Sequence, residues 1–255
     1  MKSPLVIANW KMKVAGEEAV NLARKVVKAA AKYSQAEVVL CPAFTEIAVV
    51  SQAVKGTSVK LGAQDCFWEA TGAFTGEVSP QALRAYGASY VILGHSERRE
   101  HLAETSAMIH KKIKTAQDTG LTPILCIGES FSERAEGQKE VVLIRELHEA
   151  LNGLWLNEKQ SLVVAYEPIW VIGSGQAVSG EEAEHTHQVI KQTLFDLFPT
   201  SVVAEQIKII YGGSVDPENV AQFTAQPTVD GVLVGGASLD AVIFSALVAA
   251  AVKNN

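Results

Sequence analysis

The sequence predicts an α/β fold, a (β/α)8 barrel in which eight parallel strands are surrounded by helices. Short runs rich in Val, Ile and Leu recur along the chain, and such runs are typical of strands buried on both faces of a parallel sheet. Amphipathic stretches, for example residues 17–33, separate these runs. Eight strand–helix units in 255 residues match the dimensions of this barrel. No change of composition divides the chain, so we expect a single domain over residues 1–255.

Each expected strand is a short apolar run. In order, the runs are LVIANW from Leu5, EVVLC from Glu37, VKLGAQ from Val59, YVILGH from Tyr90, TPILCIG from Thr122, LVVAYE from Leu162, IKIIYGG from Ile207 and GVLVGG from Gly231. Helix starts are predicted at Ser79, which precedes a proline, and at Asp216, which also precedes one. Ser179 predicts a third start, because it could form a capping box with Glu182.

An open, doubly wound sheet is the alternative arrangement of the same units. Its dinucleotide-binding fingerprint is missing, because GSGQAV at residues 173–178 begins as G-x-G but lacks the later glycine. That stretch also follows the sixth expected strand and not the first. The chain contains no Walker A sequence either, so the closed barrel is favoured.

Composition limits the classes of partner. The formal net charge of −6 argues against a nucleic-acid partner. No apolar run reaches 18 residues, so no membrane partner is expected, and AVIFSALVAAAV at residues 241–252 predicts a buried helix. The three cysteines, Cys41, Cys66 and Cys126, are far apart and form no CxxC, which fits a reduced, cytoplasmic protein.

Polar residues at the ends of the expected strands are the candidates for a site, because barrels of this kind build their active sites there. The first strand ends in Asn9, with Lys11 just beyond it. A lysine pointing into the barrel mouth would give this acidic protein a local positive charge for an anionic substrate, although most lysines are simply solvated. Glu167 follows the sixth strand, where partial desolvation would suit a general base. A solvated acid is the alternative.

His95 ends the fourth strand and precedes Ser96-Glu97-Arg98, a charged helix start. The positive end of a helix disfavours an imidazolium, so a neutral imidazole could donate a hydrogen bond to a carbonyl or enediolate oxygen. A structural histidine packed at a strand end is the alternative. Glu97 would most simply complement the helix dipole, and a contact with Lys11 is the second interpretation.

The seventh and eighth strands end in glycines, Gly212-Gly213 before Ser214 and then Gly235-Gly236. Without bulky side chains there, an anion can approach the backbone N–H groups closely. The loops after these strands are the usual phosphate site of the barrel, whereas tight turns are the other use of paired glycines. We expect no metal site, because His185 and His187 lie on different faces of a helix and are predicted to be surface residues.

Several motifs together are more specific than any of these residues alone. They are NWKM from Asn9, GAFTGEVSP from Gly72, LGHSERR from Leu93, AYEP from Ala165, IGSG from Ile172, YGGSV from Tyr211 and VDGVLVGGASL from Val229. In this order and spacing the chain resembles the triosephosphate isomerase family. The resemblance implies a TIM barrel that interconverts dihydroxyacetone phosphate and D-glyceraldehyde 3-phosphate in glycolysis and gluconeogenesis. It implies no metal and no organic cofactor.

The resemblance also implies roles for individual residues. Glu167 would be the base, and His95 would polarise the carbonyl and move protons at the enediolate oxygens. Lys11 would offset developing negative charge, and Glu97 belongs to the same catalytic group. The implied substrate-binding residues are Asn9, Lys11, Gly173, Ser214, Gly235 and Gly236. Another sugar-phosphate isomerase and a non-catalytic phosphate-binding barrel are the alternatives.

Two long segments have implied roles as well. Residues 65–79, after the third strand, would be an arm that inserts into a partner subunit, with Thr75 at its tip, which implies a homodimer. A flexible exposed loop is the alternative, but the apolar Phe67, Trp68 and Phe74 do not suit one. Residues 168–178, after the sixth strand, are long for a connection and would form a lid that excludes water.

The sequence departs from the family pattern at several positions. Lys13 and Asp65 stand where the family usually has Asn, and Asp65 is expected to add an acid near Lys11. In the lid, Val171, Ser174 and the second hinge at residues 176–178, Gln176-Ala177-Val178, also differ. These differences bear on electrostatics and on the rate of lid closure and leave the expected reaction unchanged.

Overall fold

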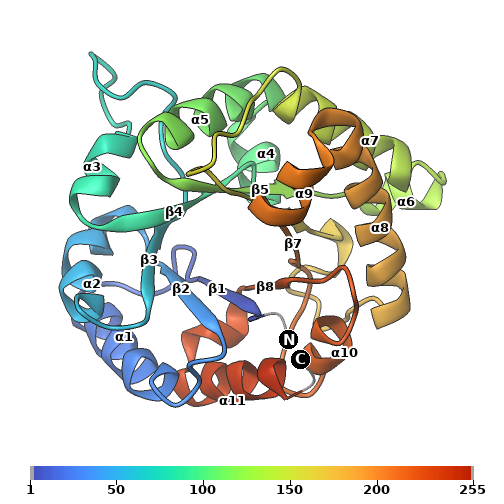
Figure 1. Cartoon of the computed structure of the whole chain (residues 1–255). Helices are drawn as coiled ribbons and strands as arrows, with labels where there is room; N and C mark the ends of the chain where they lie inside the picture. The colour runs from blue at the N-terminus through green and yellow to red at the C-terminus, as the bar shows by residue number, and fades with distance from the viewer. Residues whose placement is uncertain (1–2, 254–255) are drawn as a thin grey trace.

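The computed structural model describes residues 3–253 and closes eight parallel strands into a barrel in chain order, as the sequence predicts (Figure 1). The strands are β1 (Leu5–Asn9), β2 (Glu37–Cys41), β3 (Lys60–Ala63), β4 (Ala88–Leu93), β5 (Thr122–Ile127), β6 (Leu162–Tyr166), β7 (Ile207–Tyr211) and β8 (Gly231–Val234). Pairing of β1 with β8, in which Leu5 lies opposite Gly231, closes the barrel. All eight strands occur where the apolar runs predict them, within two residues at their starts.

Helices form a ring outside the strands (Figure 1). The α-helices are α1 (Gly16–Ala30), α2 (Ile47–Val54), α3 (Pro80–Ala85), α4 (Ser96–Leu102), α5 (Ser106–Asp118), α6 (Phe131–Ala135), α7 (Lys139–Leu151), α8 (Gly180–Leu197), α9 (Thr200–Gln206), α10 (Val220–Thr224) and α11 (Ala241–Val252). Three short 3₁₀ helices are η1 (Phe44–Glu46), η2 (Ile169–Val171) and η3 (Gly236–Leu239). In α1 the buried residues Ala19, Leu22, Ala23 and Val26 follow the helical period and face the strands.

The strands are buried on both faces, which explains their continuous apolar sequences. Alternate residues such as Val6 and Ala8 pack outward against the helices. The intervening residues, including Leu5 and Ile7, fill the barrel interior. On β3, a Cβ at Gly62 would lie 2.5 Å from Sγ of Cys41, so the close packing of β2 and β3 requires glycine at this position.

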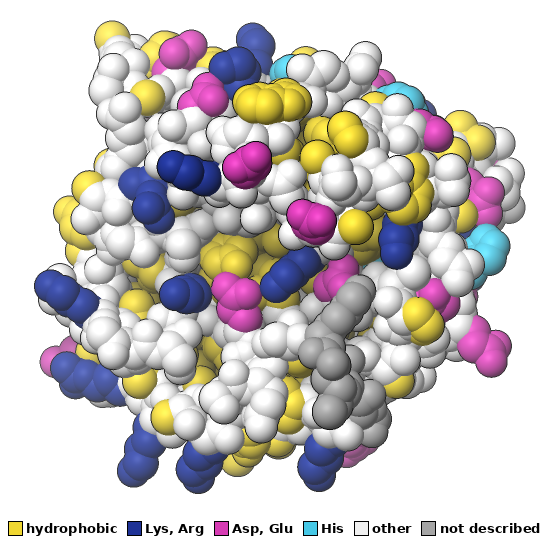
Figure 2. Space-filling model, viewed as in Figure 1, with side chains coloured by type: hydrophobic (Ala, Val, Ile, Leu, Met, Phe, Trp, Pro, Cys, Tyr) yellow, Lys and Arg dark blue, Asp and Glu magenta, His cyan; other side chains and the backbone are white. Residues whose placement is uncertain are grey.

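Charged side chains meet inside the barrel at the amino-terminal ends of the strands. Lys208 on β7 pairs with Glu37 on β2 at 3.4 Å, and the hydroxyl of Tyr90 on β4 donates to Glu37 at 2.6 Å. Three strands are therefore joined by polar contacts at this end. On the face shown in Figure 2, basic and acidic side chains are interspersed around a central area of hydrophobic ones, with no continuous basic stripe.

The expected helix starts differ in how closely they are confirmed. Ser79 caps α3 by accepting hydrogen bonds from the backbone N–H groups of residues 81 and 82. Ser179 caps α8 by accepting from Glu182 N–H at 3.1 Å, but the Glu182 carboxylate binds Arg134, so only half of the capping box forms. Asp216 accepts from Glu218 N–H and begins a turn, and α10 starts four residues later.

Helix α11 buries one side only. Phe244, Leu247 and Val248 are buried, whereas Val242 is 79% exposed. Within residues 3–253, none of the helices combines the length and the apolar character needed to cross a bilayer.

The prediction for His187 is wrong. His185 on α8 is exposed, as expected, but His187 is fully buried against Tyr166, with ring centroids 6.2 Å apart. One turn of α8 therefore presents one histidine to solvent and one to the core, because α8 packs on β7 and its His187 reaches Tyr166 at the end of β6. Burial lowers the pKa of His187 to about 4, although the Thr228 carbonyl and the Glu184 carboxylate partly oppose this shift.

The buried His187 predicts a pH dependence of stability. Between pH 6.5 and about 4 the unfolded chain binds a proton at this residue that the folded chain does not. The contribution of neutral His187 to stability is therefore fully present above pH 6.5 and is lost as the pH falls toward 4, by about 3 kcal/mol in total. We expect His187→Gln to flatten the dependence of the unfolding free energy on pH over this range. His185→Gln is the matched control, and parallel curves for wild type and His187→Gln would contradict the assignment.

Candidate active site

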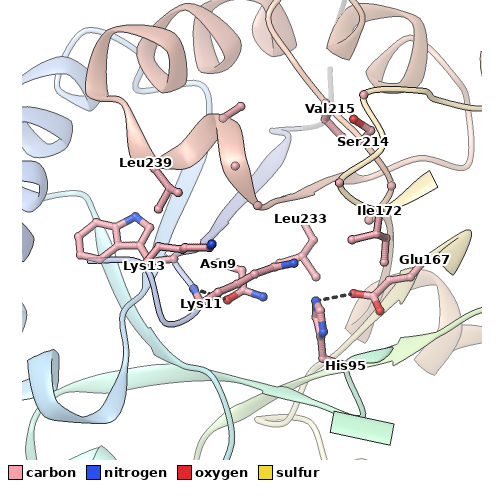
Figure 3. A pocket seen from close by; sticks show the side chains of 18 residues that line it. Asn9, Lys11, Lys13, His95, Glu167, Ile172, Ser214, Val215, Leu233 and Leu239 are labelled. Carbon is pink, nitrogen blue, oxygen red and sulfur yellow. Dashed lines mark hydrogen bonds and ion pairs between the residues drawn. The ribbon is translucent and has the colours of Figure 1, made fainter. Parts of the chain in front are cut away.

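A cavity of about 310 Å³ lies at the carboxyl-terminal ends of the strands (Figure 3). Its lining contains all of the predicted substrate-binding residues, namely Asn9, Lys11, Gly173, Ser214, Gly235 and Gly236. The predicted catalytic residues His95 and Glu167 line it as well. These residues lie at or just after the ends of five strands, β1, β4, β6, β7 and β8, so closure of the barrel brings them together. Glu97 does not line the cavity but contacts Lys11.

Glu167 and His95 face each other across the cavity floor (Figure 3). Glu167 follows β6, and its N–H donates to the carbonyl of Ile127 on β5 at 2.8 Å. Its side chain is 2% exposed. Oε2 accepts a hydrogen bond from Ser96 N–H at 3.2 Å, which leaves Oε1 at 3.4 Å from Nε2 of His95. Oε1 has no hydrogen-bond partner among the described residues.

The protonation of His95 follows from its position as the residue that caps α4. Its Nδ1 accepts a hydrogen bond from Glu97 N–H at 3.2 Å, which uses the lone pair of that nitrogen. We therefore assign the neutral tautomer with its proton on Nε2. This places an N–H donor beside Glu167 and agrees with the neutral imidazole that the helix start predicts.

Lys11 has a left-handed backbone with φ 52°, which it shares only with Ala103 among the non-glycine residues of the described chain. Such a conformation costs about 1–2 kcal/mol in an L-residue, so other contacts must hold it. Lys11 N–H donates to Oδ1 of Asn9 at 3.1 Å. Nε2 of Gln64 donates to the Lys11 carbonyl and to the Cys41 carbonyl, both at 2.9 Å.

Sequence reasoning missed Gln64. Its position one residue after β3 was a strand-end signal of the same kind as Asn9, but nothing in the sequence places it against Lys11. Gln64 holds the backbone of Lys11 from the end of β3, and it does not line the cavity.

Glu97 contacts Lys11, which is the second interpretation of this residue from the sequence. Nζ of Lys11 lies 2.6 Å from Oε1 of Glu97. Partial burial opposes ionisation of Glu97, but the hydrogen bond and the charge of Lys11 favour it, and the pKa of Glu97 lies below its usual value. This contact orients the Lys11 side chain.

Space requires glycine at the end of β7, where a Cβ at Gly213 would lie 2.2 Å from the Tyr211 hydroxyl oxygen, whereas a Cβ at Gly235 or Gly236 would make only an ordinary contact or none. None of Gly212, Gly213, Gly235 and Gly236 has a positive φ, so turn conformation does not explain them. A Cβ at Gly212 would lie 3.0 Å from Cγ of Glu167, and a Cβ at Gly235 would lie 3.6 Å from Cε of Lys11. Bare backbone at these positions leaves the cavity open to an anion, as the phosphate interpretation requires.

The segment 168–178 is anchored at its start by Glu129, a residue that sequence reasoning also missed. The Glu129 side chain is buried and accepts hydrogen bonds from Nε1 of Trp170 at 3.0 Å and from the hydroxyl of Tyr166 at 3.2 Å. Burial raises the pKa of Glu129, and these hydrogen bonds only partly oppose the shift. The Arg134 guanidinium lies 4.5 Å from the Trp170 ring centroid, a cation–π contact.

The apolar residues of this segment have separate environments. Val171 is fully buried, Trp170 packs on Arg134, and Ile172 lines the cavity with Gly173. Of the three large apolar residues, only Ile172 therefore faces the site. At the other end, Val178 is 4% exposed and packs in the outer core, so the unusual second hinge ends on a buried anchor.

Asp65 is not an acid beside Lys11. Its carboxylate lies 2.8 Å from Nζ of Lys112 and 2.7 Å from Nη2 of Arg98, and Lys112 also binds Glu104. Asp65, Glu104 and Lys112 are all buried, so two cations balance two carboxylates away from the cavity. The expectation that Asp65 disturbs the charge around Lys11 is wrong, because α5 supplies a lysine to neutralise it.

Comparison with known proteins places the chain in a family. The model of a family described as "Triosephosphate isomerase" matches residues 4–251. The chain belongs to the triosephosphate isomerase family. The family that its motifs resemble is therefore confirmed.

Relatives in this family match almost end to end. The chain is 47% identical over 251 residues to triosephosphate isomerase of Moorella thermoacetica, covering 97% of this chain and 98% of the relative. It is 43% identical over 239 residues to that of Dictyoglomus thermophilum, covering 94% and 96%. The crystal structure of triosephosphate isomerase from Bartonella henselae matches with a TM-score of 0.87 at 30% identity, covering 97% of this chain and 98% of that one.

Gln64 predicts a specific loss of activity. Gln64→Leu removes the donor that holds the left-handed backbone of Lys11, and a shift of its ammonium by even a fraction of 1 Å weakens contacts with a reacting group. We expect kcat/KM to fall about tenfold with the far-ultraviolet circular dichroism spectrum unchanged. Gln52→Leu, at an exposed position of α2, is the control. Equal activity of the two variants would refute the positioning role of Gln64.

Proposed function

We propose that this chain interconverts dihydroxyacetone phosphate and D-glyceraldehyde 3-phosphate through an enediolate, with Glu167 as the general base. One observation carries the assignment of the base. Oε1 of Glu167 is buried, has no hydrogen-bond partner among the described residues, and lies 3.4 Å from Nε2 of His95 in the cavity. Membership of the family supports the choice of substrate and reaction.

The reaction uses these two side chains in turn. Glu167 removes a proton from the carbon next to the carbonyl, and the electron pair of that C–H bond forms the double bond of the enediolate. Nε2–H of His95 donates to the oxygen that gains negative charge. Glu167 then returns the proton to the neighbouring carbon, while His95 moves a proton between the two oxygens. The substrate and the product have the same composition, so no oxidant or reductant is needed.

Lys11 and the backbone of the rim hold the substrate. The Lys11 ammonium would offset the developing negative charge. Glu97 accepts a hydrogen bond from this ammonium, and Asn9 accepts one from the Lys11 backbone N–H. Main-chain N–H groups at Ser214, Gly235 and Gly236 would bind the phosphate, because the bare glycine backbone allows close approach.

We propose that residues 168–178 close over the bound intermediate. Gly173 and Ile172 already line the cavity, so a small movement of this part would place an N–H donor on the phosphate and an apolar side chain against water. Pro168 to Val171 stay anchored on Glu129, and Val178 anchors the far end. Exclusion of water protects the enediolate from loss of its phosphate.

The base assignment is tested at Glu167. Glu167→Gln keeps the shape of the side chain but removes its basicity, so we expect turnover in a coupled isomerase assay to be abolished with the fold intact. Glu167→Asp withdraws the carboxylate by about 1 Å and is expected to lower kcat roughly 100-fold. Glu181→Gln, at an exposed position of α8, is the control. Near-native activity of Glu167→Gln would show that another group is the base.

The same assay separates the alternatives. A non-catalytic phosphate-binding barrel would give no turnover in the wild type, and another sugar-phosphate isomerase would turn over a different substrate. The presence of both Glu167 and His95 in one cavity favours catalysis over binding alone.

We propose a homodimer in which residues 65–79 form the contact with the partner. Phe67 is buried and stacks on Trp68 with ring centroids 4.1 Å apart, and it packs at a tilt against Phe74 at 4.5 Å, which gives the segment a defined shape. The segment projects beyond the helices (Figure 1). Thr75 is exposed at its outer part, and Phe74 and Met12 are 43% and 94% exposed. Such apolar exposure is typical of surfaces that a partner covers.

Thr75→Arg is expected to disrupt this contact. A charged side chain at a closely packed, desolvated interface is unfavourable, so we expect monomers on size-exclusion chromatography. Ser58→Arg, at an exposed turn before β3, is the control and should leave the dimer intact. A dimer that survives Thr75→Arg unchanged would refute the proposed arm.

We also propose that the protein works in a reducing, cytoplasmic compartment. Cys41, Cys66 and Cys126 are all buried and free, and burial raises the pKa of each thiol. The fold therefore uses its cysteines as small apolar residues and needs no disulfide.

A further inference from the structure

Lys13 lines the active-site cavity together with Lys11. It follows β1, and its side chain extends beside Leu239 on the same side of the cavity as Lys11 (Figure 3). Ala237 and Leu239 of η3 form the adjoining wall, directly after Gly236. Lys13 is therefore next to the proposed phosphate site and on the opposite side from Glu167.

The two lysines differ in their partners. The Lys11 ammonium is bound by Glu97 at 2.6 Å, so this pair contributes little net charge. No ion pair or hydrogen bond involves the side chain of Lys13 within residues 3–253. Lys13 is consequently an exposed cation at the rim of the cavity, without a side-chain partner among these residues, and can bind an anion.

A charge count of the cavity shows what Lys13 adds. Glu167 must be ionised to act as the base, and Lys11 with Glu97 sums to zero, so these three groups give the site a net charge of −1. The chain as a whole carries −6. A phosphate dianion would therefore enter a negative site if Lys13 were neutral, and the Lys13 ammonium brings the site to zero.

We propose that Lys13 forms a second anion subsite beside the phosphate site, so that the cavity binds compact ligands with two linked phosphoryl groups. One group occupies the glycine backbone at Gly235 and Gly236, and the second reaches the Lys13 ammonium. This proposal rests on the proposed function, because the first group uses the phosphate site. Diphosphate esters would then compete with triose phosphates, and Lys13 would set that selectivity.

The ligand must be compact, because both anion positions lie beside the short helix η3. Gly236, Ala237 and Leu239 lie within one short 3₁₀ helix that lines the cavity together with Lys13, so the two anion positions share one small cavity. The cavity of about 310 Å³ is at the small end of ligand sites. Phosphoryl groups joined by a single bridging oxygen satisfy both limits, and pyrophosphate is the simplest such probe.

The test compares pyrophosphate with orthophosphate. Dissociation constants are measured by isothermal titration calorimetry on wild type, Lys13→Gln and the control Lys28→Gln, an exposed lysine of α1. A charge-assisted contact to one phosphoryl group is expected to change affinity about tenfold. We therefore expect Lys13→Gln to bind pyrophosphate about tenfold more weakly, orthophosphate less than about twofold more weakly, and Lys28→Gln to match wild type.

Two results would overturn the subsite. One is equal binding of pyrophosphate by wild type and Lys13→Gln, and the other is equal weakening of both anions, which would mean a general field effect. Isomerase activity of the wild type is measured in parallel. Absence of turnover together with a pyrophosphate-specific loss in Lys13→Gln would refute the proposed reaction and support the subsite, so the two failures are distinguishable.

Discussion

The position of the Glu167 carboxylate depends on the close approach of β5, β6 and β7 at their carboxyl-terminal ends. A Cβ at Gly128 would lie 1.7 Å from the Glu167 carbonyl oxygen, so any side chain there would push β5 and β6 apart. On the other side, Gly212 N–H donates to the Tyr166 carbonyl at 2.8 Å, and a Cβ at Gly212 would touch the Glu167 side chain. Glycine at positions 128 and 212 therefore allows the Glu167 carboxylate to take the position in which it faces His95.

The first turn of α4 connects this base to the rest of the site. Ser96 N–H holds one oxygen of Glu167, and Glu97 holds Lys11. Arg98 instead turns away and neutralises Asp65, while Arg99 donates to the Gly94 and Cys126 carbonyls. Consecutive residues of one helix therefore orient the base, orient the cation, balance a buried charge and support the strand ends. Each residue of the sequence SERR at positions 96–99 thus makes a different structural contact.

Charges near the cavity are paired in a way that leaves few of them free. Lys11 is paired with Glu97, and the buried acids Asp65 and Glu104 share Lys112 and Arg98. Buried charges are stable only when paired, so this arrangement separates structural charges from those that can act on a ligand. Two charged side chains of the cavity lining have no such partner. Among the described residues, no lysine lies at salt-bridge distance from Glu167, and no carboxylate lies at salt-bridge distance from Lys13. The first suits proton transfer and the second suits an anion.

The sequence by itself determined the eight strands, their order and the polar residues at their ends, because burial on both faces leaves an apolar run that stops where the strand meets solvent. It therefore also predicted Asn9, Lys11, His95 and Glu167 as residues of one site. Only the tertiary structure decided how side chains distant in sequence contact one another. The support of Lys11 by Gln64, the anchoring of residue 170 on Glu129, the burial of His187 and the neutralisation of Asp65 all depend on which elements pack together. Periodicity and strand-end patterns are local, whereas the hydrogen bonds that join these residues to their partners span 41 to 53 residues of chain, so no local pattern records them.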